Sequence, residues 1–260
     1  MRLTIAGLQH PGHAGRVADN LRVVAEAAAE AKARGADVLV TPEMFVTGYN
    51  IGEQVARLAG EDLAGAVQAV AAEVGIAVVA GLPEQAPGGG VWNTALLVDA
   101  TGAEVTRYRK THLFGDLDRD LFVAGPAAGA PVELRGVRVG LLICYDVEFP
   151  ETVRAAVRAG ADVVLVPTAQ MEPYARVAEQ LIWTRAWESQ VYLAYVNRSG
   201  EENGLRYVGR SSIVSPTGEV LASLGPDTPT GLVLGTVDTE VVARSRGANP
   251  YLGDLRRDLY

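Results

Sequence analysis

Residues 137–167 read VRVGLLICYDVEFPETVRAAVRAGADVVLVP, and this stretch predicts a strand, a helix and a second strand in succession. Residues 137–143 are almost continuously apolar, as in a central strand of a sheet that is covered on both faces. A helix begins at Pro150, because proline suits the first helical position and an acidic residue follows it in the first turn. Gly160 ends that helix, and residues 163–166 form the next apolar strand. The order strand–helix–strand is typical of an α/β fold.

The same pattern of a helix, a glycine and a strand occurs twice more, earlier in the chain. One helix spans residues 17–34, ends at Gly35 and leads into the strand 38–40. Another spans residues 62–74 and leads, through a glycine, into the strand 76–80. The first of these resembles the stretch quoted above even in sequence, with RGADV against AGADV. This similarity indicates either two pseudo-symmetric halves or merely the ordinary way in which α/β proteins end a helix, and both interpretations stay open.

Hairpins and one further helix complete the predicted elements. Short turns that contain glycine separate pairs of strand-forming segments, and a helix with two tryptophans precedes another strand. These segments are the strand pairs 92–99 with 104–109 and 211–215 with 219–223, the helix 176–190 and the strand 192–197. The tail, residues 243–260, is polar, and we expect it to be irregular. Because no shift in composition marks a boundary, we expect a single domain over residues 1–260.

Composition and charge exclude several classes of protein. The chain has 260 residues, 48% of them hydrophobic and 21% charged, which is ordinary for a globular protein. A single cysteine leaves no disulfide framework and no zinc site built from several cysteines. The net charge of −8 suits neither nucleic acid nor an anionic membrane, and no apolar run approaches the ~20 residues of a membrane span. Since the N-terminal apolar stretch is too short for a signal peptide, we expect a cytoplasmic protein without nucleic-acid or membrane partners.

The only cysteine, Cys144, stands where the apolar strand 137–143 gives way to the segment before the next helix. At such a turn a side chain lies exposed at the end of the sheet, and nearby backbone N–H groups point at whatever binds there. A helix N-terminus also lowers the pKa of a thiol from its usual ~8.5. Cys144 is therefore a candidate nucleophile. The alternative, a buried and inert cysteine, is the common state of a lone cysteine and stays open.

Glu43 also follows a predicted strand, since it comes after Thr41 and Pro42 just beyond residues 38–40. Apolar residues surround it in the sequence. An acid among apolar residues at the carboxyl end of a sheet can have a raised pKa, which suits general acid–base catalysis. Otherwise Glu43 is a solvated acid in a loop.

Lys110 follows the strand 104–109. Because successive strand residues point to opposite faces, only one of Arg109 and Lys110 can enter a site. An ammonium group beside Cys144 would stabilise a thiolate and then an oxyanion. In the alternative interpretation, Lys110 belongs to a solvated basic strand end. His112 could be the partner of the cysteine, as in thiol proteases, although a structural hydrogen bond is the more common role.

Three segments, in this order, resemble the Glu, Lys and Cys motifs of the nitrilase superfamily, a group of carbon–nitrogen hydrolases. They are PEM at 42–44, YRKTHL at 108–113 and ICYDVEFPE at 143–151. Later segments also resemble the second half of these proteins, namely NR at 197–198, GRSS at 209–212 and NPYL at 249–252. The resemblance covers nearly the whole chain, and three motifs in the same order make it specific.

This resemblance implies a four-layer αββα sandwich whose two halves are related by pseudo-symmetry, and a homodimer or a larger homo-oligomer. It also implies a catalytic Glu-Lys-Cys triad. Cys144 would be the nucleophile, and Glu43 the general base that takes its proton and later activates water. Lys110 would stabilise the oxyanion together with a backbone N–H, which we assign to Tyr145.

One position departs from the pattern of the superfamily. Its members usually carry a second glutamate shortly after the lysine, and the matching position here, seven residues before Gly125, holds Asp118. Because aspartate is one methylene shorter than glutamate, we expect Asp118 to orient the lysine or the substrate less directly.

The implied reaction is acyl transfer, and we predict an amidase that acts on a small-molecule amide. The thiolate attacks the carbonyl, ammonia leaves, and water hydrolyses the resulting thioester. Neither a metal nor an organic cofactor is expected, because the acid, the ammonium and the thiol handle the protons and charges. A nitrilase or an N-carbamoyl amine hydrolase would use the same triad, and a non-catalytic binding protein could keep the fold, so these stay alternatives.

Glu148 bears on the choice of substrate. It lies four residues after Cys144, where branches of the superfamily that act on carboxylate-bearing substrates often have arginine. A carboxylate that faces the pocket would repel the carboxylate of a substrate. We therefore hypothesise that the substrate is a neutral or amine-bearing amide. In the alternative interpretation, Glu148 is only an acid at the start of a helix.

Overall fold

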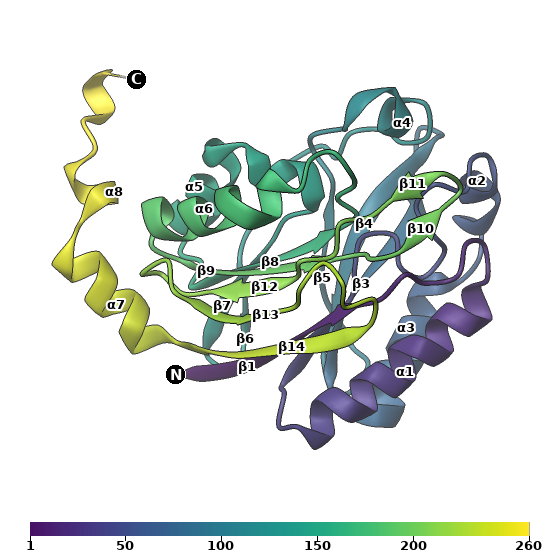
Figure 1. Cartoon of the computed structure of the whole chain (residues 1–260), viewed down its shortest axis with the longest axis horizontal. Helices are drawn as coiled ribbons and strands as arrows, with labels where there is room; N and C mark the ends of the chain where they lie inside the picture. Colours follow the sequence, from purple (N-terminus) through teal and green to yellow (C-terminus); the bar gives the residue numbers. More distant parts are fainter. Residues whose placement is uncertain (260) are drawn as a thin grey trace.

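The computed structural model describes residues 1–259 and shows two β-sheets that lie face to face, with helices on the outer sides (Figure 1). The first sheet has six strands, in the spatial order β14 (Gly231–Asp238), β1 (Arg2–Gln9), β2 (Val38–Val40), β3 (Ala77–Gln85), β4 (Val91–Val98) and β5 (Glu104–Arg109). The second also has six, in the order β13 (Val220–Ser223), β12 (Ser212–Val214), β9 (Tyr192–Asn197), β8 (Val163–Thr168), β7 (Val137–Leu141) and β6 (Val132–Leu134). A separate hairpin pairs β10 (Glu201–Glu202) with β11 (Leu205–Arg206).

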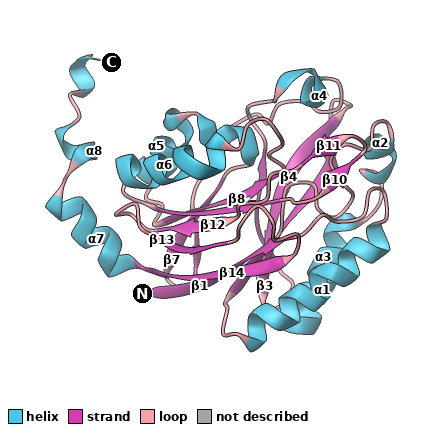
Figure 2. Cartoon of the chain, in the orientation of Figure 1, coloured by secondary structure: helices cyan, strands magenta, loops and turns pink. Residues whose placement is uncertain are grey.

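The longer helices cover the outer faces of the sheets (Figure 2). On the first sheet lie α1 (Val17–Ala33) and α3 (Leu63–Val74), and on the second lie α5 (Pro150–Arg158) and α6 (Ile182–Ser189), which continues a π-helical turn over Val177–Leu181. This arrangement confirms the four-layer αββα sandwich. The remaining helices are α2 (Gln54–Leu58), α4 (Gly115–Arg119), α7 (Thr239–Ala248) and α8 (Tyr251–Asp254), with 3-10 turns at Cys144–Glu148 and Arg257–Leu259.

The two sheets are built alike. In the first, β1, β2 and β3 run parallel, and in the second β7, β8 and β9 do, while the flanking strands pair antiparallel. Helix α1 joins β1 to β2, and α5 joins β7 to β8 in the same way. The similar sequences at the ends of these two helices therefore occupy equivalent places in two pseudo-symmetric halves.

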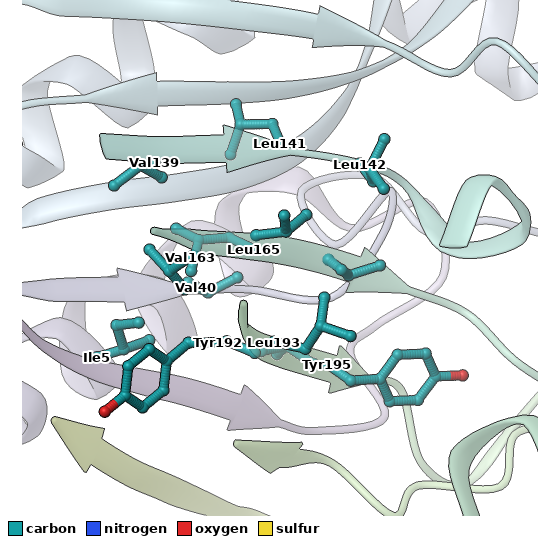
Figure 3. Packing of buried hydrophobic residues seen from close by; sticks show 14 of the residues in the cluster. Ile5, Val40, Val139, Leu141, Leu142, Val163, Leu165, Tyr192, Leu193 and Tyr195 are labelled. Atoms are coloured by element: carbon teal, nitrogen blue, oxygen red, sulfur yellow. The ribbon is translucent and has the colours of Figure 1, made fainter. Parts of the chain in front are cut away.

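The core between the sheets follows the alternation of side chains along the strands. Val38 and Val40 pack toward the second sheet, whereas Leu39 between them packs under α1 and α3. Complete burial of such a side chain contributes about 1.5–3 kcal/mol. Figure 3 shows the opposing layer of the second sheet, which includes Val139, Leu141, Val163 and Leu165.

Two predicted boundaries differ from the structure. The apolar run 137–143 does form an interior strand, with β8 on one side and β6 on the other, but this strand, β7, ends at Leu141 rather than at residue 143. The polar tail is not irregular either, since α7 begins where the Asp238 side chain accepts a hydrogen bond from the Glu240 N–H at 2.9 Å. A capped helix that buries only Val242 needs little apolar sequence, which explains the wrong prediction. No helix within residues 1–259 is both long and apolar enough to cross a membrane.

Candidate active site

The candidate residues gather at the carboxyl ends of the parallel strands, where α/β sheets commonly bind their ligands. Cys144 follows β7 of the second sheet, and Glu43 follows β2 of the first. A hydrogen bond from the backbone N–H of Glu43 to the carbonyl of Thr168, at 3.3 Å, joins the two sheets at this edge. The site therefore draws on both halves of the chain.

Close backbone packing places Glu43. The segment after β2 crosses directly over Gly81 of β3, where an added Cβ would lie 2.4 Å from the nitrogen of Met44 and 2.5 Å from the carbonyl oxygen of Pro42. Only glycine permits this approach. As a result, Glu43 is completely buried rather than a solvated loop acid.

Lys110 enters the site, and Arg109 does not. The guanidinium of Arg109 faces the other way, 2.7 Å from the Glu84 carboxylate. The ammonium of Lys110 donates to Glu43 Oε1 at 2.8 Å and to Asp118 Oδ2 at 2.6 Å, with all three side chains fully buried. The alternation argument is thus confirmed, and the interpretation of Lys110 as a solvated basic end is wrong.

Asp118 lies on α4 and contacts the lysine directly, contrary to the expectation for the shorter acid. Its place on α4 brings Oδ2 within 2.6 Å of the Lys110 ammonium without a further methylene. The N–H of Phe114 donates to the same carboxylate at 2.8 Å, and the Tyr49 hydroxyl donates to its other oxygen at 2.7 Å. Asp118 is therefore a fixed member of the buried charge cluster formed by Glu43, Lys110 and Asp118.

The charges of this cluster hold Lys110 protonated and leave Glu43 ready to accept a proton. Burial alone lowers the pKa of a lysine, but the carboxylates of Glu43 and Asp118 raise the pKa of Lys110 well above its usual value. Burial raises the pKa of Glu43, and Lys110 and a hydrogen bond from Asn93 only partly offset this. Within residues 1–259, Glu43 Oε2 has no hydrogen-bond partner.

Cys144 sits in a strained turn, with a positive φ of 44°. The residue as a whole is only 6% exposed. Burial raises the pKa of the thiol well above its usual value, and the charge of Glu43 adds to this effect, which Lys110 offsets only in part. The expected exposed side chain with a lowered pKa is therefore wrong, because desolvation outweighs any effect of the nearby helix. A thiol that is neutral at rest requires a base when it reacts.

Asp146 ties the cysteine turn to the segment that follows Lys110. Its carboxylate accepts hydrogen bonds from the N–H of Ile143 at 3.1 Å and the N–H of His112 at 2.9 Å. The His112 ring lies 2.9 Å from the same carboxylate and stacks on Phe149, with 4.3 Å between ring centroids. These contacts give His112 a structural role, separate from the thiol.

Gln170, just after β8, connects Cys144 with Glu148. Its side-chain oxygen lies 3.8 Å from the cysteine sulfur, and its nitrogen lies 3.5 Å from a carboxylate oxygen of Glu148. Burial raises the pKa of Glu148, which is partly buried here. The ring of Tyr145 packs edge-on against Phe114, with 5.3 Å between ring centroids, so two aromatic side chains lie beside the turn that holds Cys144.

Sequence reasoning missed Asn93, Gln170, Tyr49 and Asp146. Asn93 donates to Glu43 Oε1 at 2.7 Å and is the one side-chain amide in the largely apolar strand β4, which is a usable signal. Gln170 follows a strand end after a proline, as Glu43 does. Tyr49 lies in a loop, and nothing in its sequence neighbourhood indicates its contact with Asp118. Within residues 1–259, no group of three His, Cys, Asp or Glu side chains could hold a metal ion.

Comparison with known proteins adds independent findings. A family model described as carbon–nitrogen hydrolase matches residues 3–246. The chain is 45% identical to the "Hydrolase in pqqF 5'region" of Pseudomonas protegens, over 99% of this chain and 90% of that protein. It is 34% identical to the 2-oxoglutaramate amidase of Bacillus subtilis, over 100% of both chains.

A solved structure of an amidase from Nesterenkonia sp. superimposes with a TM-score of 0.88 at 35% identity, over 99% of this chain and 94% of that one. In a further structure, a variant of the Nesterenkonia amidase carries the product of Michael addition of acrylamide at its active-site cysteine. The likeness thus extends over whole chains and includes a protein whose active site contains a cysteine.

Proposed function

The chain belongs to the carbon–nitrogen hydrolase family, the nitrilase superfamily, and from that premise we propose that it is an amidase that converts a small carboxamide to a carboxylate and ammonia. One observation carries the proposal. The Lys110 ammonium is held between the carboxylates of Glu43 and Asp118, at the edge of the sheets where Cys144 also lies, and the charges of these groups contribute to the shifted pKa of the Cys144 thiol. A thiol, a base and a fixed cation are the groups that acyl transfer from an amide requires.

In the first half of the proposed reaction, Glu43 Oε2 takes the thiol proton as the sulfur of Cys144 attacks the amide carbonyl. The negative charge on the carbonyl oxygen is stabilised by Lys110 and by the N–H of Tyr145. The C–N bond then breaks, Glu43 returns the proton to the nitrogen, and ammonia leaves. The acyl group remains on the sulfur as a thioester.

In the second half, Glu43 takes a proton from water, and the water oxygen attacks the thioester carbonyl. The C–S bond breaks and the sulfur recovers its proton, so that the carboxylic acid is released and the enzyme is restored. The raised pKa of Glu43 supports this role, because a base works best when its pKa approaches the working pH.

The substrate that we propose is neutral or carries an amine. Lys110 is already paired with two carboxylates, and Glu148 brings a further carboxyl group close to the thiol through Gln170. A substrate carboxylate placed here would meet this negative charge. Similarity to a 2-oxoglutaramate amidase makes a carboxylate-bearing amide the necessary comparison.

The test is ammonia release from a panel of substrates, with the wild-type protein and Cys144→Ala side by side. The panel holds propionamide, β-alaninamide, propionitrile, the mono-amide of succinate and an N-carbamoyl amine. We expect the first two to be hydrolysed best and all turnover to be lost in the variant. Best turnover of the nitrile or the carbamoyl compound would contradict the amidase, and best turnover of the succinate mono-amide would contradict the substrate class.

A further inference from the structure

The carboxylate of Asp118 is held on both sides. Oδ2 accepts from the Lys110 ammonium at 2.6 Å and from the Phe114 N–H at 2.8 Å. The only hydrogen bond that the described residues make to Oδ1 comes from the Tyr49 hydroxyl, at 2.7 Å. A carboxylate can rotate about its bond to Cβ, and such a rotation would exchange the oxygen that faces Lys110. The contact with Tyr49 opposes that rotation.

Tyr49 is suited to be a permanent donor. Its side chain is almost completely buried, and its ring lies beneath the ammonium of Lys110, with 5.8 Å between Nζ and the ring centroid. Burial, together with the charges of Glu43 and Asp118, raises the pKa of the phenol well above its usual value. The hydroxyl therefore keeps its proton for the hydrogen bond to Asp118.

The backbone of Tyr49 is anchored by the other half of the chain. Glu202 of β10 accepts hydrogen bonds from the N–H of Tyr49 at 3.0 Å and from the N–H of Asn50 at 2.6 Å. Glu202 is buried and forms an ion pair with the fully buried Arg198 at 3.2 Å. Tyr49 is thus fixed at its main chain by one half of the molecule and at its hydroxyl by Asp118.

We propose that Tyr49 is a positioning residue for the hydrolysis: its hydroxyl locks the Asp118 carboxylate, and the locked carboxylate keeps the Lys110 ammonium where the oxyanion forms. Tyr49 acts through Asp118 and does not touch the substrate. The inference rests on the proposed function, because it takes the Lys110 ammonium to be the group that binds the oxyanion.

Because Cys144 is the only cysteine in the chain, chemical labelling can test the inference without any knowledge of the substrate. Addition of acrylamide to a thiol moves negative charge onto the amide oxygen, as attack on an amide does, so its rate reports oxyanion stabilisation. Methyl methanethiosulfonate reacts with the same thiol without forming an oxyanion. The ratio of the two labelling rates, measured by intact mass, separates loss of Lys110 positioning from a general change in the site.

We expect Tyr49→Phe to slow acrylamide addition about tenfold, the effect of losing one hydrogen bond to a charged group, and to change the methanethiosulfonate rate less than threefold. In an Asp118→Asn background the same change should cost less than twofold. Tyr192→Phe is the matched control. Tyr192 is a buried tyrosine of β9 (Figure 3), and its hydroxyl lies near Asp238 rather than Asp118. This control variant should alter neither labelling rate. Thermal unfolding verifies that each variant is folded.

Three results would overturn the inference: wild-type acrylamide addition in folded Tyr49→Phe, equal slowing with both reagents, or an undiminished effect in the Asp118→Asn background. Failure of the proposed function would be distinguishable from these. The protein would then hydrolyse no amide of the panel, while the labelling ratio would still fall in Tyr49→Phe.

Discussion

In the first half of the molecule, α1 leads into β2 and the chain continues through Pro42 to Glu43. In the second half, α5 leads into β8 and the chain continues through Pro167 to Thr168. The segments VLVTPE and VVLVPT thus occupy equivalent places, and the N–H of Glu43 donates to the carbonyl of its counterpart Thr168. One position holds a buried carboxylate and the other a neutral hydroxyl.

A second pair of equivalent positions differs in the same way. Lys110 directly follows β5, and Leu224 directly follows the equivalent strand β13. The thiol, by contrast, comes from the second half, at the end of β7. Apolar strands, helices and the glycines between them are repeated and produce the fold twice, whereas each residue to which we assign a chemical role occurs in only one half.

The largest effect is expected at Lys110. Lys110→Met should lower kcat about 10²–10³-fold, because it removes the preorganised positive charge that would stabilise the oxyanion. The equivalent change in the second half, Leu224→Met, should leave kcat within twofold of the wild type. The first variant should also unfold more easily, by about 3–5 kcal/mol, since Glu43 and Asp118 lose their buried counter-ion. Steady-state kinetics and chemical denaturation measure both effects. Equal loss of activity in the two variants would contradict the division of roles between the halves.

A smaller effect, with a distinct pH signature, is expected at Asn93. Glu43 serves as a base only when ionised, so kcat/KM falls as the pH drops through its pKa, which burial raises above the usual 4.5. The hydrogen bond from Asn93 lowers this pKa. Asn93→Ala should therefore shift the acid limb of the kcat/KM profile to higher pH and reduce kcat about tenfold.

Thr94→Ala provides the control for this profile, because Thr94 points to the other face of β4 and donates to Glu84 at 2.9 Å. Its acid limb should coincide with that of the wild type. An unshifted limb in Asn93→Ala would show that Glu43 is not the base whose ionisation limits the rate.

At Glu148 we expect a change of selectivity rather than a loss of activity. Glu148→Gln removes a negative charge near the thiol, and should raise kcat/KM for the succinate mono-amide relative to propionamide about threefold to tenfold, or about 0.7–1.4 kcal/mol. Glu151→Gln removes an exposed acid of α5 and should leave the ratio unchanged. A constant ratio in both variants would remove Glu148 from the account of specificity.

The smallest effect separates the fold from the chemistry. Asp62 caps α3, with its carboxylate accepting from the N–H of Gly65 at 2.9 Å, whereas the equivalent helix of the second half, α6, has no side-chain cap. Asp62→Ala should lower the free energy of unfolding by about 1 kcal/mol and leave kcat unchanged. A drop in kcat would mean that the packing of α3 influences the geometry of the active site.

Much of the fold could be predicted from the sequence, because helix, glycine and apolar strand repeat in a pattern that local propensity and burial alone explain. The missed strands β1 and β14 pair along their whole lengths, from Arg2 with Asp238 to Gln9 with Gly231, across the full length of the chain. No local pattern can indicate a pairing between residues so far apart in the sequence.

The location of a site residue was predictable where it depends on the end of a strand, as for Glu43 after β2 and Lys110 after β5. It was not predictable where distant contacts decided, as for the burial of Cys144, whose neighbour Gln170 follows the next strand of the sheet, β8. The pKa of the thiol depends on that burial, and the predicted lowering of this pKa was therefore wrong: burial raises it. Contacts such as that between Tyr49 and Asp118 likewise form only when the loops fold together.

The most direct test of the central claim, that charges of the first half activate a thiol of the second, is the intact mass of the protein during turnover. The wild-type protein is mixed with propionamide and quenched in acid within milliseconds. We expect a population heavier by one propionyl group, located on Cys144, and absent in Glu43→Gln, Lys110→Met and Cys144→Ala. Ammonia release at the wild-type rate by Cys144→Ala, or an acyl group on another residue, would contradict the claim.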